Sequence, residues 1–102
     1  MTSIAIVYFS GYGHTTKQAE AVQAGAAAVA DTQVKLYQID ANGDLPEGAL
    51  EEIGAADAII YGSPTYMGGP AWQFKKFADA SSKAWFTQAW KDKIAAGFTN
   101  SA

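Results

Sequence analysis

The stretch from Ile4 to Thr16, IAIVYFSGYGHTT, joins an unbroken apolar run to a loop that contains two glycines. The run consists of β-branched, aromatic and small residues, which is typical of a strand covered on both faces of a parallel sheet. The loop carries hydroxyl groups and a histidine, and the first cationic side chain after it is Lys17. The stretch therefore predicts a buried strand over residues 4–9 that leads through a tight turn into a helix.

The residues after this turn have helical periodicity. Between about residues 15 and 30, Ala19, Val22, Ala26 and Val29 recur at steps of three and four, and polar side chains lie off that stripe. Such a stripe is typical of a helix that packs on a sheet.

Three further strands are predicted along the chain. Residues 33–37 alternate polar and apolar side chains, as an edge strand does. Residues 57–62 form a second buried run, which we expect to stop at Ser63 and Pro64 because proline lacks an amide hydrogen. Residues 93–100 resemble a fourth strand, which ends in a threonine and an asparagine.

Two further helices are predicted between these strands. A short one is expected over residues 46–53, with Pro46 in its first turn. Another is expected to start at Gly68-Gly69-Pro70, with Ala71, Phe74, Phe77 and Ala78 on one face. Strands and helices then alternate as βαβαβαβ, which predicts an α/β fold with a right-handed, doubly wound parallel sheet in a single domain, residues 1–102.

Composition narrows the possible functions. The chain has seven lysines against ten carboxylates, a net charge of −3, and the lysines are scattered, which argues against nucleic-acid binding. It has no cysteine, so disulfides, thiolate metal sites and a cysteine nucleophile are excluded and redox chemistry requires an organic cofactor. No apolar stretch approaches the roughly 20 residues of a membrane span, and we expect a cytoplasmic protein.

The loop after the first strand is suited to an anion. Its glycines let the backbone approach a ligand, and the helix amides and the hydroxyls of Ser10, Thr15 and Thr16 can hold a phosphate. The G-K-[ST] ending of a Walker P-loop is missing. Two other interpretations stay open: an ordinary turn capped by Thr15 or Thr16, and a dinucleotide site in which Asp40, 29 residues after Gly11, binds a ribose.

A second loop with ligand-binding character follows the third predicted strand. Residues 64–69, PTYMGG, combine a rigid proline, a hydroxyl, an aromatic ring, a thioether and two glycines. Such a loop can lie along a flat aromatic ring and hydrogen-bond its polar edge. In a doubly wound sheet, ligands bind beyond the carboxyl ends of the strands, so both loops and the 99–101 segment are expected at one edge.

Together these motifs resemble a known family. The combination of SGYGHT (residues 10–15), GSPTYMG (62–68) and TNS (99–101) is similar to flavodoxin-like flavoproteins, in particular the tryptophan-repressor-binding-protein type of NAD(P)H:quinone oxidoreductases and FMN reductases. The resemblance implies noncovalent FMN and a sheet of order 2-1-3-4-5. This chain would supply strands 2-1-3-4, and the fifth strand and last helices would be missing.

The resemblance also implies a set of cofactor-binding residues. The FMN phosphate would be held by Ser10, Gly11, Tyr12, Gly13, His14 and Thr15. The isoalloxazine would be held by Pro64, Thr65, Tyr66, Met67 and Gly68, and ring or ribityl oxygens would contact Thr99, Asn100 and Ser101. No metal ligand or catalytic side chain is implied.

Three functions remain open at this point. The first is an oxidoreductase that passes electrons from NAD(P)H to a quinone-like acceptor, the second is a flavodoxin-type carrier that docks to partner proteins, and the third is a truncated fold with weak or no FMN binding. An acceptor aspartate of a response regulator and a phosphatase cysteine are both absent. We also expect a homo-oligomer, or else a fragment that needs a complementing piece. Without a fifth strand residues 94–98 would form an apolar edge, and without the last helix one sheet face would be covered by the first helix alone, so either surface could pair with a second copy.

Overall fold

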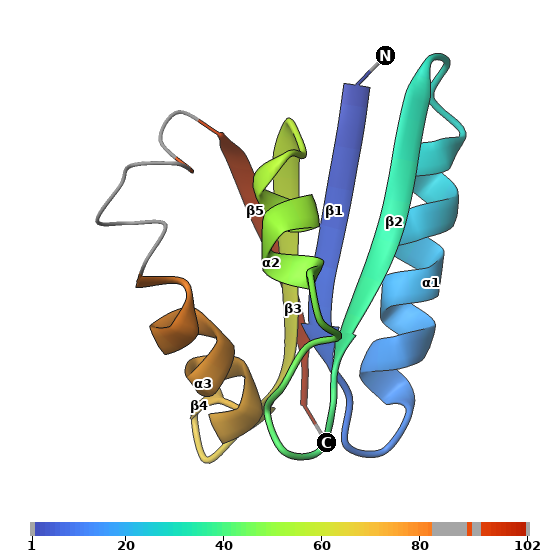
Figure 1. Ribbon diagram of the computed structural model, residues 1–102. Coiled ribbons are helices and arrows are strands. Elements are labelled where there is room, and N and C mark those ends of the chain that lie inside the picture. Colours follow the sequence, from blue (N-terminus) through green and yellow to red (C-terminus); the bar gives the residue numbers. More distant parts are fainter. Residues whose placement is uncertain (1, 83–89, 91–92, 102) are drawn as a thin grey trace.

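Parallel strands form the centre of the fold. The computed structural model describes residues 2–82, 90 and 93–101, and in these residues the parallel order is β2-β1-β3-β5 (Figure 1). The strands are β1 (Thr2–Phe9), β2 (Thr32–Ile39), β3 (Ala58–Tyr66) and β5 (Ile94–Asn100). The predicted doubly wound parallel sheet is confirmed, and β5 is the predicted fourth strand.

Helices cover the two faces of this sheet. Helix α1 (His14–Ala27) packs on one face, and α2 (Ala49–Gly54) and α3 (Trp72–Ala80) pack on the other (Figure 1). Among the described residues, no helix has the length and apolar character needed to cross a membrane.

The alternation of side chains along β1 produces two cores. Ile6 and Tyr8 pack with Ala19 of α1, whereas Val7 and Phe9 belong to the cluster on the side of α2 and α3. Since successive side chains of a strand point to opposite faces, one apolar run serves both layers. β1 is thereby fixed at the centre, with the β1–α1 loop at its carboxyl end.

The prediction that the third strand stops at Ser63 and Pro64 is wrong. β3 continues to Tyr66, and Pro64 lies opposite Asn100 of β5. The pairing of β3 with β1 has already ended at Gly62, so by Pro64 the parallel ladder has a neighbour on one side only. A proline is tolerated there because a strand with one neighbour needs fewer amide donors for its ladder hydrogen bonds.

The predicted helix starting at Gly68-Gly69-Pro70 needs a similar correction. Gly69–Pro70 form a short strand, β4, antiparallel to the end of β3, and α3 begins only at Trp72. Ala78, placed on the buried face by its spacing, is exposed. Because the glycines continue a hairpin with β3, the helix starts later than the composition suggests.

Candidate functional site

Three segments meet at the carboxyl edge of the sheet. They are the β1–α1 loop, the end of β3 with its turn into β4, and the end of β5, all at the lower edge of Figure 1. β1 and β3 are adjacent and parallel, and so are β3 and β5. Strand order alone therefore brings segments that are up to 90 residues apart to one place.

The β1–α1 loop is folded by its own serine. The Ser10 hydroxyl accepts a hydrogen bond from the Gly13 amide (3.0 Å), which closes the turn. Gly13 has φ 90°, a left-handed conformation that a glycine adopts without strain. The side chains of Tyr12 and His14 are exposed at this turn.

The start of α1 carries no side-chain cap. Gly13 is the capping residue, and neither Thr15 nor Thr16 caps the helix, so that interpretation of the loop is wrong. The first helical bond runs from the Lys17 amide to the Gly13 carbonyl (3.2 Å). The amides of residues 14–16 therefore lack an intrahelical partner, and the positive end of the helix faces the loop.

The end of β3 turns back into β4 through a hairpin with a two-residue turn. Tyr66 pairs with Gly69, and Met67 and Gly68 between them have φ values of 50° and 80°. Positive φ at both central residues defines a type I′ turn, a geometry that favours glycine. Met67 projects fully into solvent from this turn.

A buried serine anchors the same segment. Ser63 donates from its hydroxyl to the Pro64 carbonyl (3.0 Å) and accepts from the Ala71 amide (3.0 Å). We call residues 64–68, which comprise the end of β3 and the turn after it, the ring loop. The two hydrogen bonds of Ser63 fix both ends of this segment. The predicted ring loop is thus held at its base and open at its tip.

An aromatic pair joins the β1–α1 loop to the ring loop. The rings of Tyr12 and Tyr66 are edge to face, with centroids 6.5 Å apart. A Cβ placed on Gly11 would lie 2.6 Å from the Tyr66 hydroxyl oxygen. The glycine at position 11 therefore lets Tyr66 lie across the first loop.

Side-chain hydrogen bonds connect β5 to both of the other segments. Thr99 donates its hydroxyl to the Ser63 carbonyl (2.7 Å) and lies 2.6 Å from the Thr65 hydroxyl. Since Thr99 has a single hydroxyl hydrogen, Thr65 is the donor between them. On the other side, Asn100 Nδ2 donates to the Thr15 hydroxyl (3.2 Å), whose side chain is buried.

Gln18 is a residue that the sequence analysis did not single out. Its Nε2 donates to the Thr99 carbonyl (3.2 Å), and its Oε1 accepts from Asn100 Nδ2 (3.0 Å). Gln18 lies one turn after Thr15 on α1 and therefore on the same face of the helix. A polar residue at this position, next to the loop expected to bind a ligand, was the signal in the sequence that could have identified it.

A cavity of about 510 Å³ lies beside the ring loop. Tyr61 is part of its wall, and burial raises the pKa of this phenol, so Tyr61 stays neutral at physiological pH. A second cavity of about 480 Å³ lies between the ends of β1 and β2, beside Ser10 and Asp40. The cavity of about 510 Å³ beside the ring loop is lined by Tyr61, Gly62, Ser63, Thr65, Gly68, Gly69, Pro70, Phe74, Gly97, Phe98 and Thr99.

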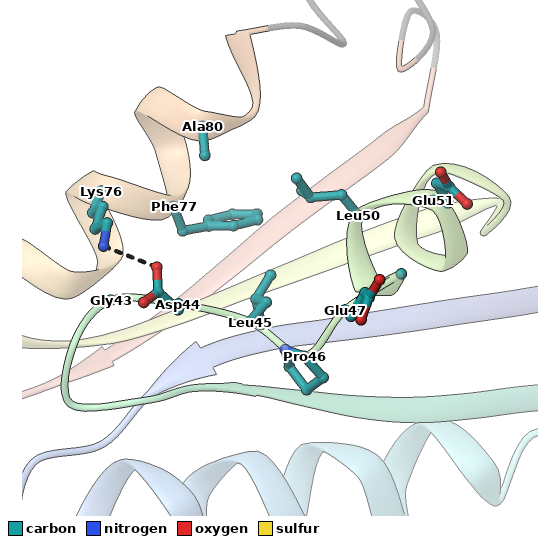
Figure 2. A pocket seen from close by; sticks show the side chains of 11 residues that line it. Gly43, Asp44, Leu45, Pro46, Glu47, Leu50, Glu51, Lys76, Phe77 and Ala80 are labelled. Carbon is teal, nitrogen blue, oxygen red and sulfur yellow. Dashed lines mark hydrogen bonds and ion pairs between the residues drawn. The ribbon is translucent and has the colours of Figure 1, made fainter.

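A further pocket, of about 460 Å³, lies between the β2–α2 connection and α3 (Figure 2). Lys76 closes one end, where its ammonium donates to the Asn42 carbonyl (2.9 Å) and pairs with Asp44 (2.8 Å). Apolar side chains such as Leu45 and Leu50 line the rest, together with Glu47 and Glu51. None of the residues expected to bind a cofactor lines this pocket.

The structure brings most of the expected site residues to the shared edge, and contacts tie some of them together. Gly11, Tyr12, Thr15, Thr65, Tyr66, Thr99 and Asn100 are linked across segments by the contacts above. Among the described residues, no hydrogen bond, ion pair or ring contact links the side chain of His14, Met67 or Ser101 to another of the three segments, and all three residues are exposed.

The arrangement of sheet, loops and open helix start defines a flavodoxin-like α/β fold. Residues 9–102 match the model of a protein family described as NADPH-dependent FMN reductase. The chain belongs to this family, whose cofactor chemistry is that of FMN.

Known proteins are similar over the whole chain. A solved structure, the flavodoxin, WrbA-like protein from Agrobacterium tumefaciens, superposes with a TM-score of 0.91 at 57% identity, covering 100% of this chain and 61% of that one. Flavodoxin FldP of Pseudomonas aeruginosa is 50% identical over 100% of this chain and 52% of its own length. Quinone-oxidoreductase QR2 of Triphysaria versicolor is 36% identical over 95% of this chain and 54% of its own. The chain thus spans about half the length of the curated relatives it matches.

Proposed function

We propose that this chain is the FMN-binding portion of an oxidoreductase that passes electrons from NAD(P)H to a quinone-like acceptor. The observation that carries the proposal is the meeting of an uncapped helix start, an aromatic ring loop and the polar end of β5 at one sheet edge. Membership of the FMN reductase family and the similarity to a protein named quinone-oxidoreductase support it.

The residues present fit FMN. In the β1–α1 loop, Ser10 to Thr15 would bind the phosphate through helix amides and hydroxyls, and no cationic side chain is needed. A Cβ at Gly13, Gly68 or Gly69 would meet no atom within 4 Å, so the space next to these backbones is open to a ligand.

The other two segments would bind the rest of the cofactor. The ring loop, Pro64 to Gly68, would lie along the isoalloxazine, and Thr99, Asn100 and Ser101 would contact its polar edge or the ribityl chain. Bound FMN supplies the redox chemistry, which the protein's own side chains lack. The protein's part is to orient the ring and to exclude water from one side of it.

Titration of the chain with FMN tests this proposal. We expect quenching of flavin fluorescence to a 1:1 stoichiometry at micromolar concentration, and binding of riboflavin at least about tenfold weaker, because riboflavin lacks the phosphate and with it charge-assisted hydrogen bonds. Equal affinity for the two flavins would contradict a phosphate site at α1, and no quenching at millimolar protein would contradict FMN binding altogether.

A flavodoxin-type electron carrier is the second candidate. It is favoured by the 50% identity to a protein named flavodoxin, whereas the small net charge of −3 argues against electrostatic steering toward basic partner proteins. Steady-state oxidation of NAD(P)H by the FMN-loaded protein with a quinone separates the two, because a carrier by itself turns over neither substrate. A cytoplasmic location stays a prediction from the sequence.

The edge of β5 supports the expected homo-oligomer. Among the described residues β5 pairs with β3 alone, and its first four residues are exposed, with Ile94 at 72%. An open apolar edge of this kind invites pairing with a second copy.

Light scattering after size exclusion tests the oligomer. We expect the mass of a dimer at high concentration and a shift to monomer for Ile94→Lys, because a lysine on an edge disfavours strand pairing. Val29→Lys is the matched control, since Val29 is also apolar and 61% exposed but lies outside β5. A monomer at every concentration would exclude the proposed pairing.

A further inference from the structure

Gln18 is placed to hold the end of β5 against α1. Its side-chain amide is both donor and acceptor, and it uses both functions on neighbouring residues, donating to the Thr99 carbonyl and accepting from the Asn100 side chain. Residues 18 and 99 are 81 positions apart in the chain, so these bonds are a product of the tertiary fold.

The two bonds are part of one continuous set between the loops. Asn100 uses one amide hydrogen on Gln18 and the other on Thr15, at the start of α1. Thr99 in turn reaches the Ser63 carbonyl and the Thr65 hydroxyl. Gln18 therefore joins α1, whose start is expected to bind the phosphate, to the end of β5, where Thr99 contacts the ring loop.

The end of β5 depends on such side-chain bonds. Within the described part of the chain, β5 has a single neighbouring strand, and its residues 94–97 are exposed. A strand held along one edge frays at its end unless side chains tie it down. α1 provides a second attachment for Thr99 and Asn100, through the side chains of Gln18 and Thr15.

We propose that Gln18 is a positioning residue of the cofactor site, which acts through Thr99 and Asn100 and couples the geometry of the ring loop to that of the β1–α1 loop. This inference rests on the proposed function for its effect on FMN. Its effect on the end of β5 is independent of any ligand.

The test is Gln18→Met, which keeps the length of the side chain and removes both hydrogen bonds. Gln23→Met is the matched control, because it makes the same chemical change on the same helix at a residue whose side chain forms no hydrogen bond within the described part of the chain. We expect the FMN dissociation constant of Gln18→Met to rise about tenfold, as the loss of two hydrogen bonds predicts, and that of Gln23→Met to stay within about twofold.

Amide hydrogen exchange without FMN provides the second readout. In Gln18→Met, the protected amides at the end of β5, residues 98–100, are expected to exchange about tenfold faster, while those of Ile6 and Val7 in the central strand keep their rates. A general loss of stability would speed exchange at both places, so the contrast separates positioning from destabilisation.

The two readouts also separate failure of this inference from failure of the proposed function. If the parent chain binds no FMN, the proposed function is wrong, and hydrogen exchange still decides whether Gln18 holds β5. If the parent binds FMN and Gln18→Met binds it equally well, or if residues 98–100 exchange at the rate of the Gln23→Met control, the positioning role is overturned.

Discussion

Replacing Gly62 by alanine is expected to destabilise the chain by about 2–3 kcal/mol, the cost of overpacking a close contact in a core. Gly62 pairs with Tyr8 of β1 on one side and with Phe98 of β5 on the other. A Cβ at this position would lie 2.8 Å from Phe98 Cε1 and closer still to Cζ and Cε2. The Phe98 ring would have to leave its place against the core of Ile6 and Tyr8.

Urea unfolding followed by tryptophan fluorescence measures this loss. Gly97→Ala is the control, since Gly97 lies in the neighbouring strand and a Cβ there would meet only the Tyr61 carbonyl at 3.5 Å, an ordinary contact. Its stability should stay within about 1 kcal/mol of the parent. Adding Phe98→Leu to Gly62→Ala should recover part of the loss, because the smaller side chain makes room. Equal effects of the two glycine substitutions would mean that β5 is not packed on β3 through Phe98.

Thr15→Val is expected to weaken FMN binding by about 10–100-fold, the range for losing one hydrogen bond to a charged group. Thr15 is buried at the start of α1, and its hydroxyl oxygen accepts from Asn100, which leaves the hydroxyl hydrogen free to donate toward the proposed phosphate site. Valine keeps the shape of the side chain and removes the hydroxyl. The affinity for riboflavin should fall less, since riboflavin has no phosphate and is affected only through the lost bond between Thr15 and Asn100.

Thr15→Ser is the complementary variant for this experiment. It keeps the hydroxyl and removes the methyl group, so it should lose some stability and keep its FMN affinity within a few-fold. Fluorescence titration of the three proteins with both flavins gives the comparison. A serine variant that loses as much FMN affinity as the valine variant would show that packing of Thr15, rather than its hydroxyl, supports binding.

Local sequence patterns predicted much of the sheet and the place of the candidate site on it. The apolar run of residues 4–9 identifies a strand buried on both faces, and the alternation in residues 33–37 identifies an edge strand. Burial on one or both faces of a strand requires apolar side chains at regular positions, so the pattern is visible in adjacent residues. Glycines and hydroxyl side chains directly after a strand indicate the β1–α1 loop, because the residues that form a tight turn are also adjacent in the sequence. These features depend only on neighbours along the chain.

Other boundaries depended on the partner strands. Pro64 suggested a strand end, yet β3 continues to Tyr66 because β5 pairs with it as far as Pro64 and β4 pairs with Thr65 and Tyr66. Gly69 and Pro70 suggested a helix start, yet they form β4, because the Met67-Gly68 turn folds them back onto β3. Which residue ends an element is decided by the pairing that remains available to it.

The sequence by itself determined the order of the parallel strands and the helices, the two loops with ligand-binding character and the likeness to FMN proteins. Only the tertiary structure decided that Gln18 contacts Thr99 and Asn100, that Tyr66 lies over Gly11, and that Phe98 packs on Gly62. The physical reason is distance along the chain. Periodicity and turn chemistry act between near neighbours, whereas these contacts join residues that become adjacent only after parallel pairing brings the strand ends to one edge.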